Sequence, residues 1–164
     1  MSNIEIRKVT TKRDLKKFVT FPWKIYKGDK NWVPPIISEK IKLLDKEKSP
    51  FFDHGDAELF MAYKDGKFSG TIAAIRDDNF IKHSKTNSGY FGFFESINDE
   101  DVSEALFKTA EDWNRKQGLT DMIGPMNPST NDECGLLIEG FDSPPVLMMT
   151  YNPKYYIKLY ENFG

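Results

Sequence analysis

The sequence predicts an α+β fold that combines antiparallel strands with one parallel βαβ unit. Residues 3–9 alternate apolar and charged side chains, as in a half-buried strand. Residues 57–63 and 68–75 are apolar runs joined across Asp65-Gly66, which is a strong hairpin signal. Residues 88–128 contain an aromatic strand, an amphipathic helix and a second apolar strand. With 164 residues and 39% hydrophobic content, we expect a single domain over residues 1–164.

The N-terminal part is predicted to add helices before the hairpin. Thr11 and Asp14 resemble a capping box, and apolar residues continue one helical face from Leu15 to Tyr26. Pro22 lies inside that stretch, so we expect two short helical pieces. A second helix is predicted over residues 36–46, and residues 77–87 are polar and are predicted to form a loop.

The βαβ unit has a special position in its first strand. Gly92 lies in the middle of the aromatic run 88–97, which suggests a bulge or a close backbone approach. Asn98 or Asp99 can cap the following helix, and Gly118 follows its end. The apolar stripe of this helix has the spacing of one buried face and comprises Val102, Ala105, Leu106, Thr109, Ala110 and Trp113.

Composition excludes several classes of protein. The 23 basic and 25 acidic residues are interspersed and give a net charge of −2, so we do not predict nucleic acid as a partner. One cysteine, Cys134, excludes an intramolecular disulfide framework and suits a reducing compartment. The N-terminus lacks a secretory h-region and no apolar run reaches membrane-spanning length, so we expect a cytoplasmic protein without a membrane partner.

Several phrases of the sequence carry a family resemblance. They are FPWKIYKGDKNWVPP, SPFFDHGDAELFMAYKDGKFSGTIAAI, YFGFFESINDEDVSEALFKTAEDWNRKQG, GPMNPSTNDECGLLIEGFDSPPVLMMTYNPKYY and KLYENFG. Together they resemble a little-characterised bacterial branch of GNAT-like N-acyltransferases. The resemblance implies a mostly antiparallel central sheet with helices on both faces, and transfer of an acyl group from acetyl-CoA or another acyl-CoA to a small-molecule amine. Relatives usually continue beyond Gly164, so we expect an N-terminal part of a longer chain with an exposed sheet edge that invites pairing.

The resemblance also implies site residues. In GNAT enzymes the acyl-CoA pantetheine lies in the gap beside the strand that precedes the central helix, which gives Phe93, Phe94, Glu95, Ser96 and Ile97 as cofactor-binding candidates. The alternative is that these aromatics are core residues. Glu95 is the candidate base, or else an outward-facing strand residue, because alternation cannot fix its face after a bulge.

Tyr160 matches the tyrosine of the family pattern Tyr-x-x-x-Gly-Phe, here Tyr160-Glu161-Asn162-Phe163-Gly164. That tyrosine often serves as the catalytic acid. Packing is the alternative.

The helix start departs from the family. The glycine-rich pyrophosphate loop is missing, and Asp99, Glu100 and Asp101 occupy its place. Carboxylates at a helix N-terminus stabilise the helix but repel an anion from the same position. The alternative function is therefore a GNAT-shaped binding or scaffold domain that has lost CoA pyrophosphate binding.

A polar cluster after the second strand of the unit is a candidate substrate rim. Its members Asn127, Asn131 and Glu133 follow the carboxyl end of that strand, where ligands often bind. The alternative is turn chemistry, in which such side chains bond their own backbone. We predict no metal site, because Asp53-His54-x-Asp56 has no second cluster of ligands, and we expect Cys134 to be inert.

Overall fold

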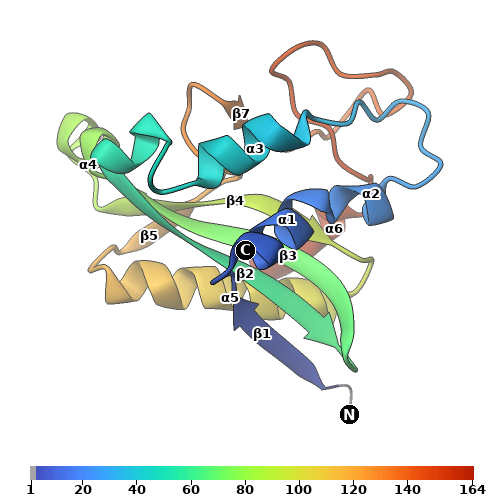
Figure 1. The fold of residues 1–164 in the computed structure, drawn as a ribbon, viewed down its shortest axis with the longest axis horizontal. Coiled ribbons are helices and arrows are strands. Elements are labelled where there is room, and N and C mark those ends of the chain that lie inside the picture. The colour runs from blue at the N-terminus through green and yellow to red at the C-terminus, as the bar shows by residue number, and fades with distance from the viewer. Residues whose placement is uncertain (1–2) are drawn as a thin grey trace.

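A five-stranded sheet forms the centre of the protein, which a computed structural model describes over residues 3–164. Its order is β1-β2-β3-β4-β5, and only β4 and β5 are parallel (Figure 1). The strands are β1 (Ile4–Lys8), β2 (Gly55–Lys64), β3 (Lys67–Asp77), β4 (Ser88–Ser96) and β5 (Asp121–Ile123). A small second sheet pairs β6 (Met126–Asn127) with β7 (Glu133–Cys134). The predicted α+β, mostly antiparallel architecture is confirmed.

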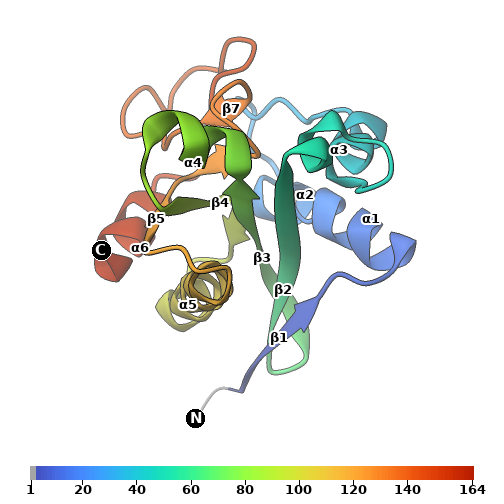
Figure 2. The same cartoon turned by 90° about the vertical axis from the view of Figure 1, so that its left-hand side faces the viewer.

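Helices cover both faces of the large sheet. Figure 2 shows α1 (Lys12–Thr20), α2 (Pro22–Ile25) and α3 (Ile37–Leu44) on one side and α5 (Glu100–Lys116) on the other. The C-terminal helix α6 (Tyr156–Phe163) packs against the α5 side. A short 3-10 helix, η1 (Pro50–Asp53), leads into β2. In residues 3–164 no helix is long and apolar enough to cross a membrane.

The local sequence signals account for most of these elements. Thr11 caps α1 by accepting the amide hydrogen of Asp14, and Pro22 separates α1 from α2 as predicted. Asp65 and Gly66 have φ values of 49° and 76° and form the tight turn between β2 and β3. On α5, Asp99 is the cap, and Val102, Leu106, Ala110 and Trp113 are buried as the stripe predicts.

One predicted loop is wrong. Residues 77–87 include a helix, α4 (Asp78–Ser84), where the polar composition suggested a loop. The Asp77 side chain accepts hydrogen bonds from the amides of Asn79 and Phe80, which supplies the cap. The centres of the Phe80 and Tyr90 rings lie 5.0 Å apart, so Phe80 packs the helix against β4. The polar average composition of the segment did not indicate this contact.

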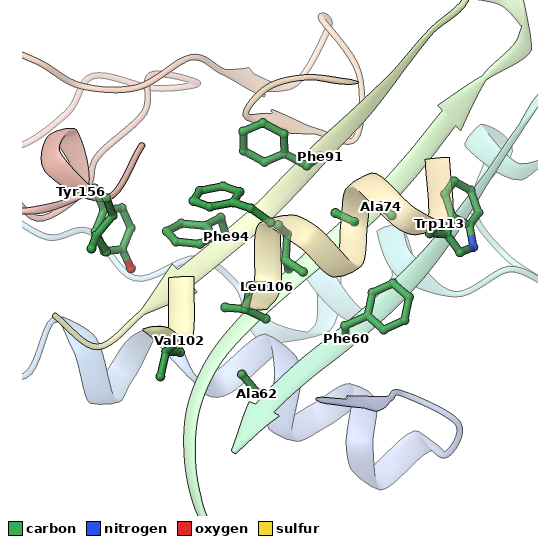
Figure 3. Close-up of a cluster of buried hydrophobic side chains, with 13 residues drawn as sticks. Phe60, Ala62, Ala74, Phe91, Phe94, Val102, Leu106, Trp113 and Tyr156 are labelled. Carbon is green, nitrogen blue, oxygen red and sulfur yellow. The ribbon is translucent and has the colours of Figure 1, made fainter. Parts of the chain in front are cut away.

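The core has two halves, one on each face of the sheet. Figure 3 shows the half under α5 and α6, where Phe94 and Tyr156 lie beside Leu106 and Val102. The Phe94 and Phe107 rings stack with centroids 4.5 Å apart. The other half joins Phe18 and Leu44 of the α1–α3 layer to the sheet. Each face of the sheet therefore has its own apolar packing, and β4 contributes to both.

β4 contains a bulge at the position that Gly92 indicated. Thr71 of β3 pairs with Glu95, and Ala73 pairs with Gly92, so two residues, Phe93 and Phe94, lie opposite one. Phe93 has a φ of 49°, which is unusual for a residue with a side chain. A Cβ on Gly92 would lie 1.8 Å from the main-chain oxygen of Met126. Both parts of the prediction, a bulge and a close backbone approach, are confirmed.

We predict that Gly92→Ala destabilises the protein by about 2–3 kcal/mol, because the added methyl group meets main-chain atoms that cannot rotate away. Urea denaturation measures the loss. Lys108→Ala, at an exposed position of α5, is the control and should change the free energy of unfolding by less than about 0.5 kcal/mol. An equal effect of the two substitutions would show that the approach of β4 to Met126 is not tight.

Candidate functional site

A cavity of about 470 Å³ opens where β4 bulges. It lies between the α1–α3 layer and the segment of residues 125–152, and α6 contributes Tyr156 and Tyr160 to its wall. Phe93, Phe94 and Glu95 all line it. Phe93 packs against the α1–α3 half of the core and Phe94 packs in the half under α5 and α6, so the cavity at the bulge contacts both faces of β4 at its edge. A volume of this size suits a small-molecule ligand.

Glu95 is held in the cavity wall by two tyrosine hydroxyl groups. The Tyr156 hydroxyl donates to Oε2 at 2.7 Å, and the Tyr26 hydroxyl lies 3.4 Å from Oε1. The Tyr26 hydroxyl also lies 3.2 Å from the main-chain oxygen of Tyr151. Glu95 therefore faces the cavity from a fixed position. It does not point outward into solvent, which was the alternative.

Burial raises the pKa of the Glu95 carboxyl to about 8 from its ordinary value of 4.5. The hydrogen bonds from Tyr156 and Tyr26 act in the opposite direction, because they favour the carboxylate. The negative charge of Glu133 adds to the increase. A carboxyl group with such a pKa can accept a proton near neutral pH and release it again, as a general base must.

The edge of β4 beyond the bulge is covered by α6. The Ser96 amide donates to the Tyr156 hydroxyl oxygen at 2.8 Å, and the Tyr155 hydroxyl donates to the Ser96 carbonyl at 2.7 Å. The Ile97 amide donates to the Ser69 carbonyl at 3.0 Å. Ser96 and Ile97 are thus tied to other protein groups and do not line the cavity, whereas Phe93, Phe94 and Glu95 do. Cofactor binding by all five residues stays a prediction.

Asn127 and Glu133, two of the predicted substrate residues, line the same cavity. Asn127 Oδ1 accepts the Phe93 amide at 2.6 Å and so holds the bulge. Glu133 pairs with Lys40 at 3.2 Å and is 38% exposed. Asn131 lies away from the cavity wall, where its amide donates to the Ser129 hydroxyl in a turn. The turn chemistry considered for this cluster is present at Asn131.

Tyr160 lines the cavity and also packs in the aromatic core. Its ring lies 5.2 Å from Phe94 and 5.1 Å from Phe107. Burial and the nearby Glu95 raise the pKa of Tyr160 well above its ordinary value, which keeps its hydroxyl protonated. Tyr160 therefore packs in the core and also lines the cavity, and its role as the catalytic acid stays a prediction.

The acidic start of α5 is used within the protein. Asp99 Oδ1 accepts the Val102 amide at 3.2 Å, and Lys64 forms ion pairs with Asp99 and Asp101. Lys158 pairs with Glu100. A capping carboxylate occupies the position where a glycine-rich loop would expose amides to phosphate. Two lysines from other elements pair with the acidic side chains at this helix start.

The mouth of the cavity is apolar. Two loops, residues 32–36 and 145–149, line it and contain large exposed side chains. These side chains are between 54% and 92% exposed and comprise Val33, Ile36, Val146, Leu147, Met148 and Met149. We call them the apolar rim. A patch of this kind marks a place where apolar groups bind.

Within residues 3–164 no group of three or more His, Cys, Asp or Glu side chains could hold a metal ion. The His54 ring instead lies 3.1 Å from the Asp77 carboxylate. Cys134 is exposed at the end of β7 and has no disulfide partner.

The sequence analysis missed three contributors to the site. The sequence indicated Tyr26 only as the end of an apolar helical face, and no pattern singled out Tyr156 or Lys40. An available signal was the hydroxyl group of each tyrosine, because a buried tyrosine usually needs a hydrogen-bond partner. The partner itself, Glu95, lies too far away along the chain for spacing to indicate it.

Two curated proteins resemble the chain in sequence. It is 36% identical over 155 residues to "Bacterial ceramide synthase" of Caulobacter vibrioides, which covers 94% of this chain and 40% of that protein. It is 38% identical over 159 residues to "Protein YghO" of Escherichia coli K12, covering 97% of this chain and 40% of that protein. The chain thus spans about 40% of the length of these relatives. No protein-family model matches the sequence.

Solved structures define the class of fold. An aminoglycoside acetyltransferase from a soil metagenomic sample, crystallised with sisomicin, matches 73% of this chain and 75% of its own at a TM-score of 0.52 and 15% identity. A GNAT family acetyltransferase from Staphylococcus aureus Mu50 matches 76% of this chain and 74% of its own at a TM-score of 0.53 and 15% identity.

The chain has the GNAT-like acyl-CoA N-acyltransferase fold, as the sequence predicted.

The raised pKa of Glu95 makes stability depend on pH. Between about pH 4.5 and pH 8 the folded protein keeps a proton on Glu95 that the unfolded chain has released, so stability falls as pH rises through this window. Glu95→Gln removes the ionisable group. The change that it causes in the free energy of unfolding should be about 2–3 kcal/mol more stabilising at pH 9 than at pH 5. The full shift would give more, at about 1.4 kcal/mol per tenfold change in proton affinity, but Glu95 is only partly buried and solvent screens its charge.

Urea denaturation at the two pH values measures this difference. Glu104→Gln, on the exposed surface of α5, is the matched control and should leave the pH dependence as it is. If Glu95→Gln and Glu104→Gln gave the same pH dependence, the environment that we describe for Glu95 would be incorrect.

Proposed function

We propose that the protein is an acyl-CoA-dependent N-acyltransferase with Glu95 as its general base. The observation on which this proposal rests is a single carboxyl group with a pKa of about 8, fixed by two tyrosines in the wall of a cavity at the β4 bulge. The GNAT-like fold supports it, since acyl transfer is the chemistry of the structural neighbours.

The reaction needs two proton transfers. Glu95 removes one proton from the acceptor ammonium, and the resulting amine attacks the thioester carbon, so that a C–N bond forms and the C–S bond breaks. The second proton of the nitrogen replaces one that is given to the departing thiolate, which leaves an amide and a thiol. Tyr160 is the candidate acid for that step: it lines the same cavity and keeps its proton, and it would give this proton to the thiolate and take the second proton of the nitrogen in exchange. No covalent enzyme intermediate is required.

The acyl-CoA would lie beside the bulge of β4. Main-chain groups alternate along a strand, so the Phe94 amide faces the same edge as the Ser96 amide. The Ser96 amide is bonded to Tyr156 and the Phe93 amide to Asn127, which makes the Phe94 amide our candidate donor to the thioester carbonyl. We therefore place the reactive end of the donor beside Phe93, Phe94 and Glu95.

The apolar rim favours substrates with a hydrocarbon chain. Its exposed side chains surround the entrance to the cavity, where they would cover methylene groups at about 0.8 kcal/mol for each one buried. The name of the relative from Caulobacter, a ceramide synthase, refers to a long-chain amide. We propose that a small-molecule amine is acylated here, with Glu133 and Asn127 at the acceptor side of the cavity and Asn131 in the adjoining turn. We also propose that the protein acts in the cytoplasm.

We predict that Glu95→Gln lowers the rate of acyl transfer by about 10²–10⁴-fold, because the amide cannot accept the ammonium proton. Mass spectrometry would detect the amide formed from acetyl-, octanoyl- or palmitoyl-CoA with dodecylamine or sphinganine. The wild-type rate should rise with pH and level off near pH 8. Glu104→Gln serves as the control. Absence of amide with every pair of substrates, or an unchanged rate in Glu95→Gln, would contradict the proposal.

The acidic start of α5 favours a second candidate, a GNAT-shaped binding or scaffold domain without CoA pyrophosphate binding. Asp99 fills the anion position with its own carboxylate and is paired with Lys64. In this alternative the cavity binds an apolar ligand and Glu95 has no catalytic role.

A thermal-shift experiment separates the two candidates. We predict that CoA and pantetheine, which lacks the phosphates, stabilise the protein to a similar extent, because α5 offers the phosphates no free helix start. In Asp99→Gly, CoA should become the better ligand, while Asp121→Gly outside the site should change nothing. Stabilisation of the wild-type protein by CoA alone would show a phosphate site and count against the scaffold function.

A further inference from the structure

The cavity contains one positive charge. Among the side chains that line it in residues 3–164, only Lys40 of α3 is cationic, and it shares the wall with the carboxylates of Glu95 and Glu133. Its side chain is 22% exposed, which is low for a lysine. A partly buried ammonium group acts in a less polar environment than water, so its effect on a neighbouring charge is stronger there.

Two contacts fix the position of this ammonium group. Nζ lies 3.2 Å from Glu133 Oε2 and 5.9 Å from the centre of the Phe93 ring. Phe93 is the bulge residue of β4, beside the place where the proposed function puts the thioester. Glu133 comes from β7, so Lys40 is held between the second sheet and the bulge.

The departing thiolate needs such a charge. When the C–S bond breaks, both of its electrons stay on sulfur, and the sulfur is negative until a proton arrives. Tyr160 transfers its proton late, because burial and Glu95 raise the pKa of its hydroxyl. Glu133 is acidic and opposes a second negative charge in the cavity, whereas Glu95 has by then accepted the ammonium proton and is neutral. Lys40 is the cavity group whose charge is opposite to that of the leaving group.

We propose that Lys40 is a catalytic residue that stabilises the negative charge developing on the thioester sulfur during acyl transfer. Glu133 acts as its positioning residue through the ion pair. This inference rests on the proposed function and adds to it the group that accepts the charge of the leaving thiolate. The thiolate takes its proton from Tyr160, which receives the second proton of the attacking nitrogen in exchange.

The alternative is that the ion pair only joins α3 to β7. Leaving-group dependence distinguishes the two roles, since thiols of lower pKa leave more readily and need less stabilisation. A purely structural residue would affect all acyl donors to the same degree.

The test uses octanoyl-CoA and the octanoyl thioester of 4-nitrothiophenol, with dodecylamine as the acceptor. We expect Lys40→Met to lower kcat with octanoyl-CoA by about 10²-fold, as removal of one charge-stabilising donor does, and to lower it by less than about 10-fold with the aryl thioester. Lys40→Arg, which keeps the charge, should retain most of the activity with both donors.

Lys42→Met is the matched control, because Lys42 is on the same helix, exposed and outside the cavity wall. Circular dichroism would verify that each variant is folded, and Lys40→Gln replaces Lys40→Met if the latter is not. An equal loss of kcat with the two donors, or no loss, overturns the role of Lys40 while the proposed function stands. Wild-type protein that acylates no amine overturns the proposed function itself.

Discussion

The bulge in β4 is the constraint on which the cavity and its carboxyl group depend. Gly92 lets the strand approach the main chain of Met126, and Asn127 then holds the Phe93 amide. The extra residue changes the alternation of the strand, so that Glu95 lies on the same face as Gly92, and the cavity at this edge is lined by Phe93, Phe94 and Glu95. Beyond the bulge the strand does not pair with β5, and Tyr155 and Tyr156 at the start of α6 bond the main-chain groups of Ser96.

Charged side chains of both signs lie around the bulge. Among residues 3–164, two acidic groups, Glu95 and Glu133, line the cavity together with one ammonium group, that of Lys40. An ammonium substrate suits the acidic side, and a thioester suits the side where Lys40 and the bulge meet. At the start of α5 the charges are satisfied internally by Lys64 and Lys158. The polar chemistry that is open to a ligand is therefore concentrated in the cavity.

The sequence predicted the elements whose signals are local. The Asp65-Gly66 turn, the stripe of α5 and the interruption at Pro22 depend on neighbouring residues, and all three are present. Helix α4 was missed because its cap, Asp77, and its apolar anchor, Phe80, lie in a segment of polar composition.

The candidate site could be predicted only in part. The family resemblance indicated Glu95 as the candidate base, but the expected bulge left the direction of its side chain open. Its partners Tyr26 and Tyr156 are 69 and 61 residues away, and Lys40 is 93 residues from Glu133. Such contacts arise from the way in which α1–α3 and the segment after β5 enclose the sheet edge, and no spacing rule within the sequence indicates them.

The proposed reaction depends on Glu95 being a desolvated carboxyl group that can exchange a proton near neutral pH. The most direct measurement is an NMR titration of the Glu95 side-chain carboxyl carbon in the wild-type protein, with Glu95→Gln used to assign the signal. Our account predicts a midpoint near pH 8, because burial disfavours the carboxylate more than the Tyr156 and Tyr26 hydrogen bonds favour it. A midpoint near 4.5, the ordinary value for glutamate, would contradict it.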